Sequence, residues 1–327
     1  MAVCREFVRQ EQAHSDLSLS WKEEEGIMPD LMSMEVAGVR FTISCQEPVI
    51  LQEFPLSYQP FLKKTLSGNG LIPIPVTLKL HDIPDTGSMI KIFDTDESWT
   101  VYKNNHDYVI ALNPPVLGKQ AVWLASLNKS FSEIVVYCSD MLRRETDAGT
   151  RVLNPVLYPL DQLLLVHILA RNQGALIHAS GIALRGNGYI FPGASGAGKS
   201  TLSKLLSGLK NMELLSDDRM AVRKIDGRFN SYGTPWSGDL GVAASKSAPL
   251  SGIFFTRQGL THRIKKIGHR QAFEKLLPVT SIPWYDRSLV TEMLTFVEEL
   301  VTRVPAYELC FKKDIDVCKT FEAFVSR

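Results

Sequence analysis

Short alternating runs of hydrophobic and polar residues dominate the first half of the chain. From about Val36 they predict strands in "VAGVRFTISC", in the proline-punctuated "LIPIPVTLKL" and in "EIVVYCSD". In "ESWTVYKNNHDYVIAL" two such runs flank the polar residues 104–107, which tolerate left-handed backbone, and this predicts a β-hairpin. We therefore expect a mostly antiparallel sheet with few helices over residues 36 to about 140. Residues 1 to about 33 are polar and partly acidic, so they are either loosely ordered or a helix docked elsewhere.

The pattern changes after "DAGTRVLNPVLYP", whose prolines and glycine predict a domain boundary. We expect a β-rich domain over residues 1–150 and a second domain over residues 151–327. Helical spacing in "LDQLLLVHILARNQG" predicts a helix, with Asp161 near its start and Gly174 as its C-cap. Next, "ALIHASGIAL" and "YIFPG" predict two strands joined by a tight "RGNG" turn. A helix in "STLSKLLSGL" and a short strand in "MELLS" follow.

The composition narrows the classes of partner. Of 327 residues, 45% are hydrophobic and 22% are charged, with a net charge of +1, as in a soluble globular protein. Such a chain has no overall field to attract nucleic acid or an anionic membrane. Its longest apolar run, around residues 163–170, is too short to cross a bilayer, and the first residues lack the apolar core of a signal peptide.

The cysteine pattern argues against a zinc site and against a disulfide framework. The five cysteines are widely spaced and include no C-x-x-C pair. We therefore expect a reducing, cytoplasmic location.

The strongest chemical signal is "GASGAGKST" at residues 193–201, which matches G-x-x-x-x-G-K-[ST]. Its glycines let successive backbone N–H groups point at phosphate oxygens, and the following helix adds its positive end. Lys199 supplies a charge for the β and γ phosphates, and the Ser200 hydroxyl is a ligand for Mg²⁺. We expect the whole loop to bind the nucleotide: Gly193, Ala194, Ser195, Gly196, Ala197, Gly198, Lys199, Ser200 and Thr201.

A pair of aspartates, Asp217 and Asp218, ends the short strand predicted after this loop's helix. In an α/β layout the carboxyl end of that strand lies near the ligand-binding loop. Two carboxylates there can hold Mg²⁺ together with Ser200, and one can accept a proton from an attacking hydroxyl. Next to phosphates and to each other, one of the two should have a raised pKa. The plain alternative is a surface Asp-Asp turn.

Other candidates are weaker. His178, in the strand before the loop, is either a buried core histidine or a residue that contacts the γ phosphate or the aspartates. The loop "YGTPWSGD" at residues 232–239 is either ordinary turn chemistry or a segment that faces the substrate. Arg257 and Arg263 can neutralise charge in a transition state or simply lie on the surface.

"IHASGIAL…GYIFPGASGAGKSTLSKLL…LLSDD" resembles the catalytic domain of HPr kinase/phosphorylase, over roughly residues 160–240. It is also similar to the nucleotide-binding core of ATP-dependent phosphoenolpyruvate carboxykinases. The resemblance implies an α/β fold with a mixed-sheet P-loop kinase core, here beside a β-rich N-terminal domain. It implies ATP and Mg²⁺, with Asp217 or Asp218 as base toward a serine hydroxyl and its neighbour as metal ligand. It places His178 and Lys199 in the active site and leans toward a homo-oligomer.

Departures from these families limit what the resemblance implies. Thr201 stands where HPr kinases have Glu, and no "ExRGxG" stretch follows the aspartates, so HPr is not identified as the acceptor. The further motifs of a full carboxykinase are absent, and we reject that activity. Some relatives of the standalone type modify the C-terminal serine of lasso precursor peptides. Acceptor recognition by the β-rich domain is our expectation, because nothing in it looks catalytic.

Three functions remain open at this point. The first is a kinase that transfers the γ-phosphoryl group to a hydroxyl of a peptide, a protein or a small molecule. The second is an ATP-dependent regulatory or assembly protein that uses the loop as a conformational switch, and the third is an inactive binding module. The chain lacks the N-K-x-D motif of GTPases and the L-S-G-G-Q motif of transporter ATPases. Because the loop lysine, the loop serine and both aspartates are present together, we favour the kinase.

Overall fold

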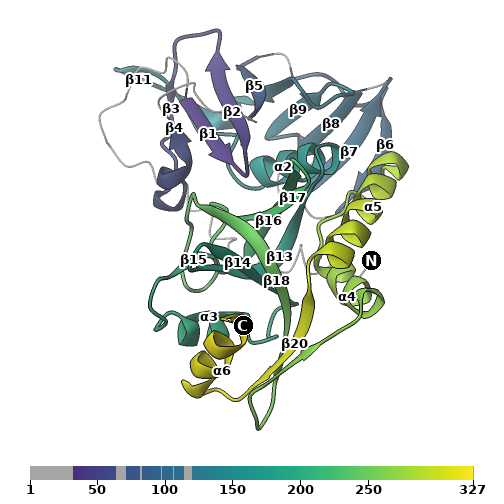
Figure 1. Cartoon of the computed structure of the whole chain (residues 1–327). Coiled ribbons are helices and arrows are strands. Elements are labelled where there is room, and N and C mark those ends of the chain that lie inside the picture. Colours follow the sequence, from purple (N-terminus) through teal and green to yellow (C-terminus); the bar gives the residue numbers. More distant parts are fainter. Residues whose placement is uncertain are drawn as a thin grey trace. The chain divides into compact units, whose positions relative to one another are not determined.

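Figure 1 shows the computed structural model, which describes residues 32–63, 71–81, 83–96, 98–105, 107–113 and 120–326. The described chain is rich in strands, with mixed sheets and few helices. It divides into two compact units: the first runs to Phe54 and then over Leu62–Gln162, and the second comprises Pro55–Phe61 and everything from Leu163 onward. Apart from residues 32 and 33, the N-terminal segment discussed above lies outside the described residues.

The position of this division differs from the boundary expected at residue 150. It falls within helix α2 (Leu160–Arg171). Strand β12 (Gly149–Val152) runs across residue 150 and pairs in parallel with β3 (Ile50–Leu51). The prolines that suggested a boundary therefore follow a strand that is tied to the first unit.

The first unit is built mainly from strands. Its described residues form a nine-stranded sheet in the order β4-β1-β2-β5-β10-β9-β8-β7-β6 and a small sheet β11-β12-β3. In the larger sheet, β5 pairs in parallel with β2 and with β10, and the other pairs are antiparallel. The predicted hairpin is confirmed, and Asn105 in its turn has a φ of 55°. The remaining bounds are β1 (Met32–Val36), β2 (Val39–Cys45), β4 (Leu62–Lys63), β5 (Ile72–Lys79), β6 (Ile90–Asp94), β7 (Trp99–Asn104), β8 (Asp107–Leu112), β9 (Trp123–Leu127), β10 (Ile134–Cys138) and β11 (Arg143–Thr146).

The second unit contains one mixed sheet, in the order β14-β13-β16-β17-β18-β20-β19, with β15 paired to β13. Because β14 also pairs with β18, five of these strands close into a ring of pairings. The strands are β13 (Gly174–Leu184), β14 (Asn187–Pro192), β15 (Met212–Ser216), β16 (Arg219–Ile225), β17 (Arg228–Tyr232), β18 (Ser247–Gln258), β19 (Arg263–Lys266) and β20 (Ala306–Phe311). The helices are α3 (Lys199–Leu206), α4 (His269–Leu276), α5 (Arg287–Arg303) and α6 (Asp316–Val325).

The parallel pairings in this sheet bring several strand ends together. Strand β18 is parallel to both β14 and β20. Strand β15 runs antiparallel to β13, as β14 does. The carboxyl ends of β14, β15, β18 and β20 therefore lie along the same edge, where side chains from distant segments can meet.

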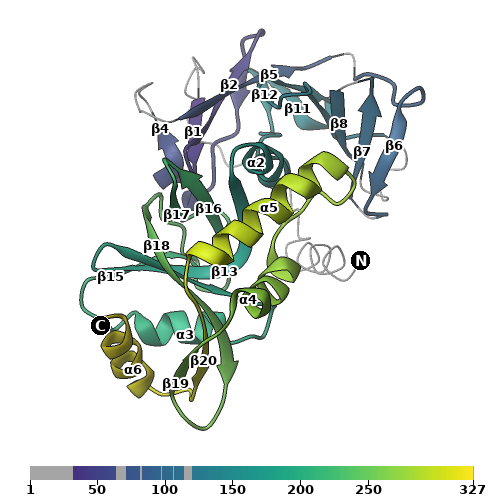
Figure 2. The same cartoon turned by 45° about the vertical axis from the view of Figure 1, so that its right-hand side comes forward.

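Helices cover both faces of this sheet. On one face, Phe254 and Leu309 share an apolar cluster with α3 and α6, which lie side by side in Figure 2. Phe255, the next residue on β18, points to the opposite face and lies under Lys275 of α4. The "GASGAGKST" motif therefore leads into a helix that is packed on the first face.

The predicted helix before β13 is confirmed as α2, but Gly174 does not cap it. Gln173 has the left-handed φ of 49°, and Gly174 is already the first residue of β13. A Cβ at position 174 would lie 2.9 Å from Cγ of Arg223, so close packing between strands requires this glycine. In the part of the chain that the structure describes, no helix is both long and apolar enough to cross a membrane.

Candidate functional site

The "GASGAGKST" motif forms a strand, a loop and a helix, with β14 ending at Pro192 and α3 beginning at Lys199. Gly196 and Gly198 have φ angles of 80° and 89°, which favour glycine. At Gly193 a Cβ would lie 2.9 Å from Cβ of Ala197. The loop's path therefore depends on all three glycines. Ala194, Ser195 and Gly196 are exposed, whereas Ala197, Gly198, Ser200 and Thr201 are partly buried.

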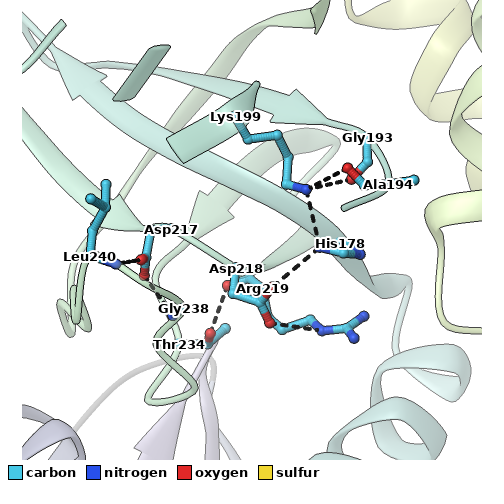
Figure 3. A network of polar contacts seen from close by, with 10 residues as sticks. All are labelled: His178, Gly193, Ala194, Lys199, Asp217, Asp218, Arg219, Thr234, Gly238 and Leu240. Carbon is cyan, nitrogen blue, oxygen red and sulfur yellow. Dashed lines mark hydrogen bonds and ion pairs between the residues drawn. The ribbon is translucent and has the colours of Figure 1, made fainter. Parts of the chain in front are cut away.

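Lys199 is buried, and its ammonium group turns back toward the loop. Nζ donates to the carbonyl oxygens of Gly193 at 2.7 Å and Ala194 at 3.0 Å, and it lies 3.1 Å from Nε2 of His178 (Figure 3). The charge predicted to meet phosphates is thus held at the end of β14, beside His178.

His178 lies where β13 exchanges one partner strand for another. Residues up to His178 pair with β16, and residues from Ala179 pair with β14. The carbonyl of His178 accepts from Gly193 N at 3.2 Å, which ties this position to the start of the loop. A histidine within a buried strand is therefore placed beside the "GASGAGKST" motif.

Nε2 of His178 lies 3.2 Å from Oδ1 of Asp218 as well as 3.1 Å from Lys199. A protonated nitrogen donates to the carboxylate and an unprotonated one accepts from the ammonium, so the two hydrogen bonds belong to different tautomers. Burial lowers the pKa of His178, and Arg219 and Lys199 lower it further, although Asp218 acts in the opposite direction. The imidazole is therefore neutral near pH 7.

Asp218 is surrounded by cationic and polar groups. Its Oδ2 lies 3.3 Å from Nε of Arg219. Burial alone would raise the pKa of Asp218, but the hydrogen bond from His178 and the charges of Arg219, His178 and Lys199 bring it below its ordinary value. The raised pKa expected within the aspartate pair is therefore wrong for Asp218, because its neighbours are cations rather than the second carboxylate.

Asp217 points away from this cluster, as Figure 3 shows. Its Oδ1 accepts from Gly238 N at 2.9 Å and its Oδ2 from Leu240 N at 2.6 Å, and the side chain is buried. Adjacent aspartates that look equivalent in the sequence thus have different partners. Only Asp218 lies beside Lys199 and His178.

The "YGTPWSGD" loop lies next to both aspartates. Thr234 donates to the carbonyl oxygen of Arg219 at 2.6 Å, and Trp236 is buried. A Cβ at Gly238 would lie 3.1 Å from Cβ of Asp218, so the loop backbone passes directly against that residue. Residues 233–236 of the loop are therefore part of the core, and the chain becomes partly exposed again from Ser237.

The structure also brings in two residues that the sequence analysis did not identify. Thr256 of β18 donates to the carbonyl oxygen of Ala197 at 2.9 Å, and Gln258 lies beside Gly198. The available signal was the long strand "SAPLSGIFFTRQ", whose alternate residues 254, 256 and 258 share a face, but its parallel pairing with β14 is a long-range feature. Arg257 points elsewhere, 3.6 Å from Glu308, and Arg263 is exposed on β19.

Comparisons with known proteins give little further information. No family model matches this chain, and no curated protein matches it. Among solved structures, the HPr(Ser) kinase/phosphatase from Coxiella burnetii is similar to this chain at 12% sequence identity and a TM-score of 0.26, over 46% of this chain and 93% of that one. A likeness of that size does not establish a shared fold.

Proposed function

We propose that this protein is an ATP- and Mg²⁺-dependent kinase that transfers the γ-phosphoryl group to a hydroxyl. The main support is a line of contacts from the glycine-rich loop through Lys199 and His178 to the carboxylate of Asp218. A protein that only holds phosphates needs the loop and the lysine. This site also has the carboxylate of Asp218, which is linked to that lysine through the imidazole of His178. Phosphoryl transfer needs such a group to accept the proton of the attacking hydroxyl.

The residues at this site fit Mg²⁺ in the way that kinases hold it. Mg²⁺ takes one or two protein oxygens together with phosphate oxygens and waters. Ser200, in the first turn of α3, and Asp218 offer such oxygens, and Asp217 is the other candidate. Among the described residues there is no group of three or more His, Cys, Asp or Glu that could hold a metal, which suits an ion held largely by phosphates. When bound, the ion neutralises phosphate charge.

In this proposal, each group has a defined task. Backbone N–H groups of the loop and the start of α3 bind the phosphates, and Lys199 exchanges its carbonyl partners for phosphate oxygens. The acceptor oxygen bonds to the γ phosphorus, the bond to the bridging oxygen breaks, and ADP leaves. Asp218 accepts the hydroxyl proton. With a pKa below its ordinary value, Asp218 is ionised near neutral pH and has an unprotonated carboxylate to accept that proton.

We propose a serine of a peptide or protein as the acceptor, for example in a lasso precursor peptide, as the resemblance in the sequence suggests. The β-rich first unit is then a candidate for acceptor recognition. A mixed P-loop α/β core of the HPr kinase type, a cytoplasmic location and a homo-oligomer belong to the same proposal. Nucleic acid and membranes are not proposed partners, since the net charge is only +1.

The test is transfer of label from γ-labelled ATP, with Mg²⁺, to a library of seryl peptides. Lys199→Ala and Asp218→Asn should each lower transfer by at least about a hundredfold, the usual scale for a general base. Asp226→Asn, in the exposed turn between β16 and β17, is the matched control and should leave transfer unchanged. Nucleotide binding without transfer to any peptide or to the protein itself would instead support the conformational switch.

A further inference from the structure

Both carboxylate oxygens of Asp217 accept hydrogen bonds from one short backbone segment. Gly238 N lies 2.9 Å from Oδ1 and Leu240 N lies 2.6 Å from Oδ2. The residue is only 3% exposed, so these bonds form in a water-poor environment where they are strong. A side chain used in this way is suited to holding the backbone of residues 237–240 in place.

The surrounding loop, residues 233–244, is fixed at its two ends by other contacts. Gly233 N donates to Lys246 O and Ala244 N to Leu215 O, each at 3.0 Å, and Ala243 bridges to Ser216. The ends of the loop are thus joined to the sheet through the backbone. In contrast, the hydrogen bonds that Asp217 accepts connect the 237–240 segment to the bend between β15 and β16.

The 237–240 segment lies directly against Asp218. Gly238 packs against Asp218, the proposed base, so closely that a Cβ would approach it to 3.1 Å. The glycine-rich loop is bordered by another element, β18, where Thr256 donates to Ala197 O. Because residues 237–240 contact Asp218 and are partly or fully exposed, they are available to a hydroxyl that approaches Asp218 from solvent.

We propose that Asp217 is a positioning residue that holds residues 237–240 as the acceptor-binding segment, rather than a ligand of Mg²⁺. The ligand of this segment is a serine-bearing peptide whose hydroxyl enters beside Asp218. The acceptor assignment rests on the proposed kinase function. The positioning role of Asp217 does not, because it rests on the hydrogen bonds that Asp217 accepts from the segment.

The first experiment measures amide hydrogen exchange across residues 233–244 in the full-length protein. Asp217→Asn preserves side-chain size but removes one acceptor oxygen and the charge, so exchange at Gly238 and Leu240 should accelerate by about tenfold or more. Leu240→Pro removes one donor without altering the carboxylate and should accelerate exchange at Gly238. Leu240→Ala keeps the donor, and Asp239→Asn alters an exposed neighbour, so in both variants the amide of Gly238 should exchange at the wild-type rate.

The second experiment separates acceptor binding from metal binding. For a seryl peptide that the wild type phosphorylates, Asp217→Asn and Leu240→Pro should raise the peptide KM about tenfold and leave the KM for MgATP within about twofold. The Mg²⁺ concentration for half-maximal binding of a fluorescent ATP analogue should stay within about twofold of wild type.

Two results would overturn this assignment. One is unchanged exchange at Gly238 and Leu240 in Asp217→Asn, which would show that the carboxylate does not hold the segment. The other is a tenfold higher Mg²⁺ requirement in Asp217→Asn but not in Leu240→Pro, which identifies a metal ligand. If the wild type labels no peptide, the kinase proposal and the acceptor assignment fail together, and hydrogen exchange still decides whether Asp217 holds the segment.

Discussion

The ammonium of Lys199 lies 3.1 Å from Nε2 of His178, although 21 residues separate them in the chain. The contact exists because β13 and β14 form a hairpin in which Pro192, the last residue of β14, pairs with Ala179, next to His178, and Lys199 opens the helix that follows β14. The same nitrogen of His178 reaches Asp218 at 3.2 Å. One imidazole thus links the lysine of the "GASGAGKST" motif to a carboxylate, and the role of each of these residues can be tested by substitution.

Lys199→Met should weaken ATP binding by at least about tenfold, because a charge-assisted contact to phosphate is lost while the apolar stem is kept. The matched control is Lys204→Met, on the exposed side of the same helix, which should bind ATP like the wild type. Equilibrium titration with a fluorescent ATP analogue measures both. Equal affinities for the two variants would exclude Lys199 from the nucleotide site.

Transfer by the wild type should be nearly independent of pH down to about pH 6.5. Burial lowers the pKa of His178 from 6.5, and His178, Arg219 and Lys199 together bring the pKa of Asp218 below its ordinary value, so both remain in their basic forms in this range. The measurement is kcat/KM between about pH 5 and pH 8. Loss of half the activity already at pH 7 would contradict these pKa directions.

His178→Gln should lower transfer by about ten- to a hundredfold at pH 7, because the imidazole that bonds to Asp218 and lies beside Lys199 helps to keep the proposed base in place and ionised. His269→Gln, at the exposed start of α4, is the control and should transfer like the wild type. ATP binding, measured separately, should change little in either variant. A normal rate in His178→Gln would reduce His178 to a structural residue of β13.

Local patterns were sufficient to predict the elements around the site. The helical spacing before β13, the turn between β13 and β14, and the glycine-rich motif followed by α3 are all short-range signals, and the structure confirms these elements. The glycines could be predicted because backbone at positive φ excludes most other residues.

Long-range relationships could not be predicted in the same way. Asp217 and Asp218 are equivalent by sequence, and their roles separate only because residues 238 and 240 return to bond Asp217. Thr256 lies 59 positions from Ala197 and meets it through the parallel pairing of β14 with β18. No local periodicity encodes such a pairing, since it depends on how the sheet closes.

Thr256→Val should raise the KM for MgATP by about three- to tenfold. The substitution keeps the shape of the side chain but removes the hydroxyl that donates to Ala197 O at 2.9 Å, a bond with a net value of about 0.5–1.5 kcal/mol. Thr256→Ser retains the donor and should restore most of the affinity. Identical KM values in the valine and serine variants would show that this bond does not set the loop geometry.

Gly233→Ala should lower the free energy of unfolding by about 2 kcal/mol or more. The new Cβ would lie 2.1 Å from Ala244 O and 2.5 Å from Leu215 O, and backbone atoms in this position cannot move aside cheaply. Gly208→Ala is the matched control, since its nearest contact is 3.7 Å from Leu205 O. Urea denaturation of both variants gives the comparison, and equal stabilities would contradict the packing argument.

Stability should fall as the pH is lowered from about 6.5 to 4, because His167 must remain neutral in the folded protein. Its Nδ1 donates to Leu163 O at 2.7 Å and its Nε2 accepts from the Tyr285 hydroxyl at 2.8 Å, an arrangement that only the neutral ring can make. Burial lowers the pKa of His167 from 6.5 to about 4, against a smaller raising effect of the Leu163 carbonyl.

Between pH 6.5 and about pH 4, His167 binds a proton in the unfolded chain but not in the folded chain. Acid therefore favours unfolding, by up to about 3 kcal/mol over the whole interval. Urea denaturation at pH 7, 5.5 and 4.5 should show this loss in the wild type and a smaller loss in His167→Gln, whatever the stability of that variant at pH 7. The exposed His269→Gln variant should follow the wild type. If His167→Gln loses stability with the same pH dependence as the wild type, another group accounts for the acid sensitivity.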